Sequence, residues 1–175
     1  METKDYSLEE ALGEAIRMEE EGKEFYLEFS KNVRGNWLKE MFKELALEEE
    51  NHIKTVKKVY EKIKNEGKLE DWIVNTQNRP PVFGSIFDEA VIKDVKVLED
   101  EISATSMAMG IEEKSIEHYE KLAKAFETDP KLKRFFLTLS YEERGHYLRI
   151  FDALEYLKDP GSFLLLKERS MRNGG

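Results

Sequence analysis

The 175-residue chain contains no cysteine. This absence excludes disulfide bonds, metal centres held by thiolates, and catalysis by a thiol. Proline and glycine are also scarce, at 4 and 10 residues, whereas 37% of the residues are charged. Because few residues break helices and many favour them, the composition predicts long helices rather than an all-β fold.

Long apolar runs are missing as well. No segment approaches the length that spans a membrane, and the first residues, METKDYSLEE, lack the apolar core of a secretory signal. We therefore expect a cytoplasmic protein without a membrane partner. The net charge of −9 argues against binding to nucleic acid. A single Gln against 29 Glu and 20 Lys is typical of a thermophile, although long helices favour the same residues.

Start and stop signals divide the chain into four long helices, which we expect over residues 7–34, 37–65, 102–126 and 130–157. Short turns follow the first and third helices and make antiparallel pairs. The long segment 67–100, with one or two short helices over 85–100, lets the chain cross the bundle. The pattern predicts an all-α fold, a ferritin-like up-down-down-up four-helix bundle with one long crossover between helices two and three. Residues 1–158 are expected to form this single domain, and 159–175 a tail that docks on the bundle or on a neighbouring subunit.

The two halves of the chain repeat one chemical pattern. Glutamate, glutamate and histidine recur with offsets of 93 residues for the first pair and 94 for the other two. The repeated residues are Glu19, Glu49 and His52 in the first half and Glu112, Glu143 and His146 in the second. A repeat that preserves possible metal ligands together with core residues points to a two-metal site inside a helical bundle.

The helical period places these six residues on core faces. Glu49 and His52 lie in seven-residue rows otherwise made of apolar side chains, and the second half repeats this arrangement. The neighbouring Glu48 and Glu142 fall off these rows, so we prefer the buried member of each pair. Four buried carboxylates would repel one another strongly, but two divalent cations would neutralise them, with imidazole nitrogens as further ligands.

The predicted metal ligands are Glu19, Glu49, His52, Glu112, Glu143 and His146. Carboxylate and imidazole ligands suit two iron ions, with manganese or zinc as alternatives. Tyr26 and Tyr119 are candidate hydrogen-bond donors to the ligand carboxylates, although ordinary core tyrosines would occupy the same positions. His118 lies off the row of Glu112 and is not expected to bind metal.

The segments LALEEENH and LSYEERGH and the two EExxxExY segments resemble the rubrerythrin branch of the ferritin-like diiron proteins over residues 7–157. The resemblance implies a pair of iron ions that reacts with hydrogen peroxide or dioxygen, usually in a homodimer. Rubrerythrins of full length also carry a cysteine-ligated rubredoxin domain, which a chain without cysteine cannot form. We therefore expect a separate electron donor, such as a rubredoxin. An additional glutamate ligand of rubrerythrins is replaced by Ser115, whose counterpart in the first half is Gly22.

The primary hypothesis is a rubrerythrin-like redox protein of the peroxidase type. The main alternative is a ferroxidase that stores or handles iron, because the six-ligand pattern also resembles bacterioferritin-type centres. An oxygen-activating hydroxylase of the membrane-associated kind is disfavoured by the mean hydropathy of −0.64. A helical interaction module that binds no metal is the simplest remaining alternative.

Overall fold

A computed structural model describes residues 7–66, 99–161 and 163 of the chain. Four α-helices make up this part: α1 (Leu8–Asn32), α2 (Asn36–Glu66), α3 (Glu99–Ala125) and α4 (Pro130–Lys158). Their ends lie within three residues of the predicted ones. The short helices expected before α3, and most of the tail, fall outside the described residues.

The helix ends follow the predicted capping signals. Ser7 and Glu10 form a capping box at the start of α1, in which each side chain accepts a hydrogen bond from the other's backbone N–H. Asp129 caps α4 by accepting hydrogen bonds from two backbone N–H groups, and Pro130 occupies the first helical position. These local contacts fix where the helices begin before any tertiary packing is considered.

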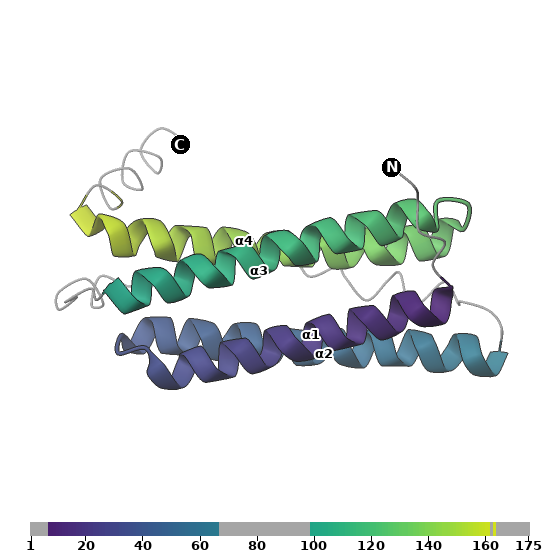
Figure 1. The fold of residues 1–175 in the computed structure, drawn as a ribbon, viewed down its shortest axis with the longest axis horizontal. Coiled ribbons are helices and arrows are strands. Elements are labelled where there is room, and N and C mark those ends of the chain that lie inside the picture. The colour runs from purple at the N-terminus through teal and green to yellow at the C-terminus, as the bar shows by residue number, and fades with distance from the viewer. Residues whose placement is uncertain (1–6, 67–98, 162, 164–175) are drawn as a thin grey trace, which may run out of the picture.

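The helices form two antiparallel hairpins, α1 with α2 and α3 with α4, which pack against each other as a bundle (Figure 1). In Figure 1, α1 and α4 run in one direction, and α2 and α3 run in the other. This is the predicted up-down-down-up order. The expected all-α four-helix bundle is therefore confirmed.

The core consists of two apolar clusters at opposite ends of the bundle. One gathers Leu12, Val59 and Phe136 with their neighbours, and the other gathers Phe42 and Ile150 with theirs. The residues predicted to lie inward along all four helices belong to these clusters or sit between them. The bundle therefore has apolar ends and leaves its middle to polar side chains.

A buried carboxylate ties the first hairpin to the second. Glu101 of α3 accepts hydrogen bonds from the backbone N–H groups of Arg34 (2.7 Å) and Gly35 (3.0 Å) in the turn that leads into α2. A negative charge is favourable at the start of a helix, where backbone N–H groups have no partner within the helix. Glu101 thus fixes the relative position of α2 and α3.

Beyond α4, Asp159 caps the helix, and the ring of Phe163 lies edge-on against Tyr156 with ring centroids 5.9 Å apart. This contact is the one part of the expected docking of the tail that falls on a described residue. Within the part of the chain that the structure covers, no helix is long and apolar enough to cross a membrane.

Candidate metal centre

Six acidic and histidine side chains meet at mid-length of the bundle, between the two apolar clusters. All four helices contribute, and each of the six residues is between 1% and 7% exposed. They are the six that the sequence predicts: Glu19 on α1, Glu49 and His52 on α2, Glu112 on α3, and Glu143 and His146 on α4. Burying six ionisable groups together costs free energy unless their charges are paired and hydrogen-bonded.

The six side chains form two overlapping groups of four. Glu19 and His52 make one group with Glu49 and Glu143; Glu112 and His146 make the other group with the same two glutamates. Within each group the candidate ligand atoms lie within 4.8 Å of one another. Glu49 and Glu143 are therefore shared, and each group has one glutamate and one histidine of its own.

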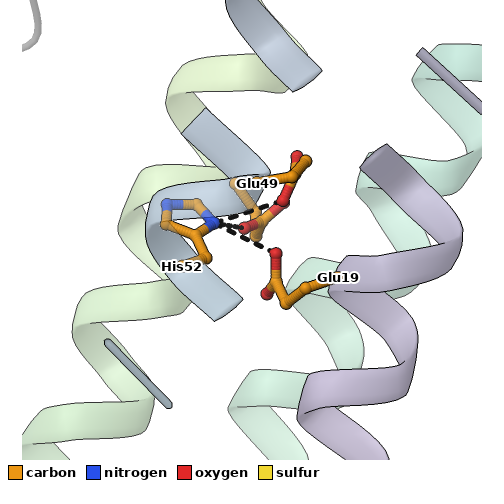
Figure 2. A group of neighbouring side chains, drawn as sticks. Glu19, Glu49 and His52 are labelled. Atoms are coloured by element: carbon orange, nitrogen blue, oxygen red, sulfur yellow. Dashed lines mark hydrogen bonds and ion pairs between the residues drawn. The ribbon is translucent and has the colours of Figure 1, made fainter. Parts of the chain in front are cut away.

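Each imidazole turns one nitrogen toward the carboxylates. His52 Nδ1 lies 3.1 Å from Glu19 Oε2 and 3.3 Å from Glu49 Oε2, and Figure 2 shows its other ring nitrogen pointing away from both. His146 Nδ1 lies 3.1 Å from Glu49 Oε1. The two rings are nearly parallel, with centroids 5.3 Å apart. Both Nδ1 atoms thus face the interior of the cluster.

The two candidate tyrosines donate hydrogen bonds across the halves. The hydroxyl of Tyr26 donates to Glu112 Oε1, and the hydroxyl of Tyr119 donates to Glu19 Oε1. Both rings are fully buried. Each tyrosine binds one oxygen of a carboxylate from the opposite half. This contact also fixes the orientation of the second oxygen of that carboxylate.

Glu48 and Glu142, which fell off the core rows, have a part in the centre that sequence reasoning missed. Glu48 Oε2 lies 2.8 Å from His146 Nε2, and Glu142 Oε2 lies 3.0 Å from His52 Nε2. A carboxylate on the outer nitrogen keeps the proton there and leaves Nδ1 available as a ligand. The available signal was that both glutamates recur in the repeat although neither lies on a core row.

Charge is balanced inside the metal-free centre by protons. Burial and the nearby charge of Glu143 raise the pKa values of Glu19 and Glu112 well above their usual range. Burial alone would lower the pKa values of the two histidines, but the facing carboxylates raise them well above their usual range. These shifts favour the protonated forms of all four groups in the metal-free centre.

The pKa values of the two shared glutamates, Glu49 and Glu143, are shifted in the opposite direction. Burial would raise the pKa of Glu49, but hydrogen bonding with Glu19 and the charge of His146 lower it well below its usual range. Burial and the charge of Glu49 would both raise the pKa of Glu143, but the two histidines lower it to about 2. The shared glutamates therefore favour their ionised forms, and their negative charge compensates positive charge on the imidazoles.

A pair of divalent cations fits this donor set. Glu112 Oε2, Glu143 Oε1 and His146 Nδ1 are buried and make no hydrogen bond, although other polar atoms lie near them. Buried polar atoms without a hydrogen bond are rare in proteins, and a bound ion is one of the features that account for them. Two doubly charged ions would also compensate the negative charge of the four carboxylates and displace protons from the ligands.

The remaining assignments follow the core pattern. Glu20 and Glu113 are exposed, as expected for residues off the core rows, and His118 belongs to neither group of candidate ligands. A Cβ atom at Gly22 would lie 3.9 Å from the side chain of Glu49, and Ser115 is 6% exposed. Gly22 therefore borders the centre, and its counterpart Ser115 is buried on α3. The assignment of the six residues as metal ligands stays a prediction.

The rubrerythrin family model matches residues 10–155 of the chain. A solved structure of a hypothetical protein from Pyrococcus furiosus is 29% identical and superposes with a TM-score of 0.64. That similarity covers 89% of this chain and 92% of the other. Among curated proteins, none matches the chain. The family match covers most of the bundle and all six candidate ligands, and the chain belongs to the rubrerythrin family.

Proposed function

We propose that this chain is a non-haem diiron redox protein that reduces hydrogen peroxide with electrons from a separate donor. The observation that carries the proposal is the pair of overlapping four-residue groups in which Glu49 and Glu143 are shared. Membership of the rubrerythrin family supports a metal such as iron in this position. Glu19 and His52 would hold one ion, Glu112 and His146 the other, and the shared glutamates both.

Two ferrous ions, once bound, supply one electron each, which with two protons convert hydrogen peroxide to two molecules of water. The chain's own contribution is to bind and orient. Tyr26 and Tyr119 hold the unshared carboxylates, and the outer glutamates fix the imidazole rings. The apolar clusters at both ends keep bulk water from the centre.

Protons for this reaction have buried sources close to the reacting position. Burial and the charge of Glu112 raise the pKa of Tyr26, and burial and the charge of Glu19 raise that of Tyr119. Both tyrosines therefore keep their hydroxyl protons at neutral pH, beside carboxylates that exchange protons when the charge of the centre changes. In this proposal, each tyrosine holds a proton next to one of the unshared glutamates.

The test is to load the protein anaerobically with Fe(II), measure bound iron, and mix it with hydrogen peroxide in a stopped-flow instrument. Two irons bound per chain and one peroxide consumed per two irons oxidised are expected. The matched control is the double variant E49Q/E143Q, which should bind little iron. Bound iron that peroxide does not oxidise in this ratio would contradict the proposal.

Iron oxidation for storage or handling is the second candidate. It is favoured by the symmetry of the six-residue set, because Ser115 stands where an additional glutamate would give the second half a ligand that the first half, with Gly22, lacks. A ferroxidase would oxidise many equivalents of Fe(II) per chain with dioxygen and would form large particles on light scattering. The peroxidase that we propose would stop after two irons, form a small assembly such as a homodimer, and be reduced again by a donor such as a rubredoxin.

A further inference from the structure

The outer face of α4 carries a row of large hydrophobic side chains. Six large hydrophobic residues are exposed in the part of the chain that the structure describes, and three of them lie on this helix. They are Tyr141, Leu148 and Phe151, which are 71%, 47% and 41% exposed, and their spacing places them on one side of the helix. The ring of Tyr147 stacks on that of Phe151, with centroids 6.4 Å apart. Single exposed hydrophobic residues are ordinary, but a group of them marks a surface that another molecule covers.

The first half of the repeat shows what the same face looks like when it meets water. At the offset of 94 residues, two of the three positions, Leu148 and Phe151, correspond to Lys54 and Lys57 on α2. Lys57 pairs with Glu20 of α1 at 2.9 Å, and Lys54 pairs within its own helix. Because the two hairpins are built alike around the centre, the difference between these faces reflects what each of them contacts.

This face of α4 points away from the rest of the bundle. The helix packs mainly against α3, and it meets α2 at the level of the centre. The candidate ligands Glu143 and His146 are buried on its inner side, whereas Leu148 and Phe151 are exposed on its outer side. The face therefore lies behind the centre and takes no part in holding an ion.

Charges of opposite sign flank the hydrophobic row. Arg144 lies one turn before Leu148, and Asp152 lies one turn after it, on the same side of the helix. The side chain of Arg144 is 50% exposed, and that of Glu155, near Asp152, is 44% exposed. Arg144 also pairs with Glu120 of α3, but a guanidinium has five N–H donors and can bind two carboxylates. Along α4 the face therefore changes from positive through hydrophobic to negative.

We propose that this face of α4 binds the same face of a second copy of the chain, with the two helices antiparallel and Leu148 on the two-fold axis. In such a contact the same patch serves both copies, so it must be complementary to itself. Arg144 of each copy comes to the level of Asp152 of the other, because each lies four residues from the axis. Tyr141 and Glu155 come to one level in the same way, seven residues from the axis.

The charge pattern selects this partner and this orientation. Antiparallel copies bring opposite charges together at both ends of the hydrophobic row, whereas parallel copies would bring like charges together. A partner with charge of a single sign would be repelled at one end of the face. The contact leaves the candidate ligands untouched, so the inference does not depend on whether the centre binds iron.

Sedimentation equilibrium of the full metal-free chain tests the assembly. The wild type should have twice the chain mass of 20.6 kDa. L148D places two like charges against each other on the axis, so it should raise the dissociation constant of the dimer by more than about 100-fold. L27D is the matched control, since Leu27 is 39% exposed on α1, which packs mainly on α2, and it should stay dimeric. Circular dichroism checks that both variants keep the helix content of the wild type.

A charge exchange tests the antiparallel register. R144E and D152R each bring like charges together twice in the dimer, and each should weaken it about 10-fold or more. The double variant R144E/D152R restores opposite charges and should return the dissociation constant to within about threefold of the wild-type value. Because the two residues lie two turns apart on one helix, this rescue cannot occur within a single chain.

The absence of cysteine allows a direct test of the axis. In L148C the two introduced thiols face each other, so mild oxidation should link the copies through a disulfide, which needs Cα atoms within about 7 Å. L27C should not be linked.

Three outcomes would overturn the inference. A wild type that is monomeric at about 100 µM would leave the face to a partner other than a second copy. A dimer that keeps its mass in L148D and is not linked through L148C would use another surface. Dissociation by L148D without rescue by R144E/D152R would contradict the antiparallel register. None of these results bears on the reaction with peroxide, which has its own test.

Discussion

At the scale of single residues, Glu49 and Glu143 have the most connected positions, because each belongs to both groups of candidate ligands. Replacing both by glutamine keeps their size but removes two negative charges. We expect E49Q/E143Q to lower metal affinity by more than about 100-fold, beyond the effect of residues that only support a ligand. Isothermal titration with Mn(II) or Fe(II) measures this directly.

The same chain offers a matched control for that variant. Glu20 and Glu113 also recur in the repeat and immediately follow unshared candidate ligands, but both are exposed. E20Q/E113Q removes the same charge from the molecule without touching the centre, so its metal binding should equal that of the wild type. Equal losses in the two double variants would show that overall charge, not the centre, governs binding.

The tyrosine hydroxyls are the next residue-scale test. Y26F/Y119F removes the donors to Glu112 and Glu19 while preserving the buried rings. We expect metal affinity to fall about 10-fold, with two ions still bound at saturation, because the unshared carboxylates lose their orientation. Titration at fixed pH gives the affinity. An affinity equal to that of the wild type would show that these tyrosines only pack in the core and do not orient the ligands.

At the scale of helices and turns, Glu101 joins the hairpins through the turn before α2. E101A would leave two backbone N–H groups without their acceptor, which costs about 1–3 kcal/mol in the free energy of unfolding. E101Q keeps an acceptor oxygen and should lose less than E101A. Urea denaturation of the metal-free variants measures both, and equal stability of E101A and the wild type would contradict this role.

The sequence predicts the helices and their buried faces well, because both depend on local patterns. His52 and Glu49 interrupt an apolar row of their own helix, so periodicity alone places them in the interior. The pairing of Glu48 with His146 is different, since these residues are far apart in the chain and on different helices. Periodicity tells which face a side chain occupies but not which residue of another helix it meets.

The contact of Glu101 with the turn at Arg34 could not be predicted from the sequence for the same reason. A single acidic residue near the start of a predicted helix has many possible roles, and nothing local connects it with a turn 67 residues earlier. The repeat is the one long-range signal in this sequence. It identifies equivalent positions in the two hairpins, and it therefore found the centre but not the contact of Arg149 with Glu48.

At the scale of the whole molecule, metal binding must displace protons from the buried candidate ligands. The pKa values of Glu19, Glu112, His52 and His146 are raised in the metal-free protein, so these groups bind protons more readily than they do in solution. Lower proton concentration favours the metal. Affinity should therefore rise with pH, by up to about tenfold per pH unit for each proton displaced.

Calorimetry in buffers of different ionisation enthalpy counts the protons released. Glu49 and Glu143 contribute none at neutral pH, because their lowered pKa values keep them ionised already. An affinity for Mn(II) that is independent of pH between about 6 and 8, with no proton release, would contradict these raised pKa values. The E20Q/E113Q protein should show the same proton release as the wild type.

The contacts across the halves also set an order for folding. Tyr119 reaches Glu19 over 100 residues, and Arg149 reaches Glu48 over 101. Each hairpin can close from local contacts, but the candidate ligands of each half meet their tyrosine and outer glutamate only after the hairpins dock. On the ribosome, the first hairpin must therefore wait for most of the second to be synthesised. The centre is complete only at the last step of folding, and metal capture by the finished site reports that the whole bundle has assembled.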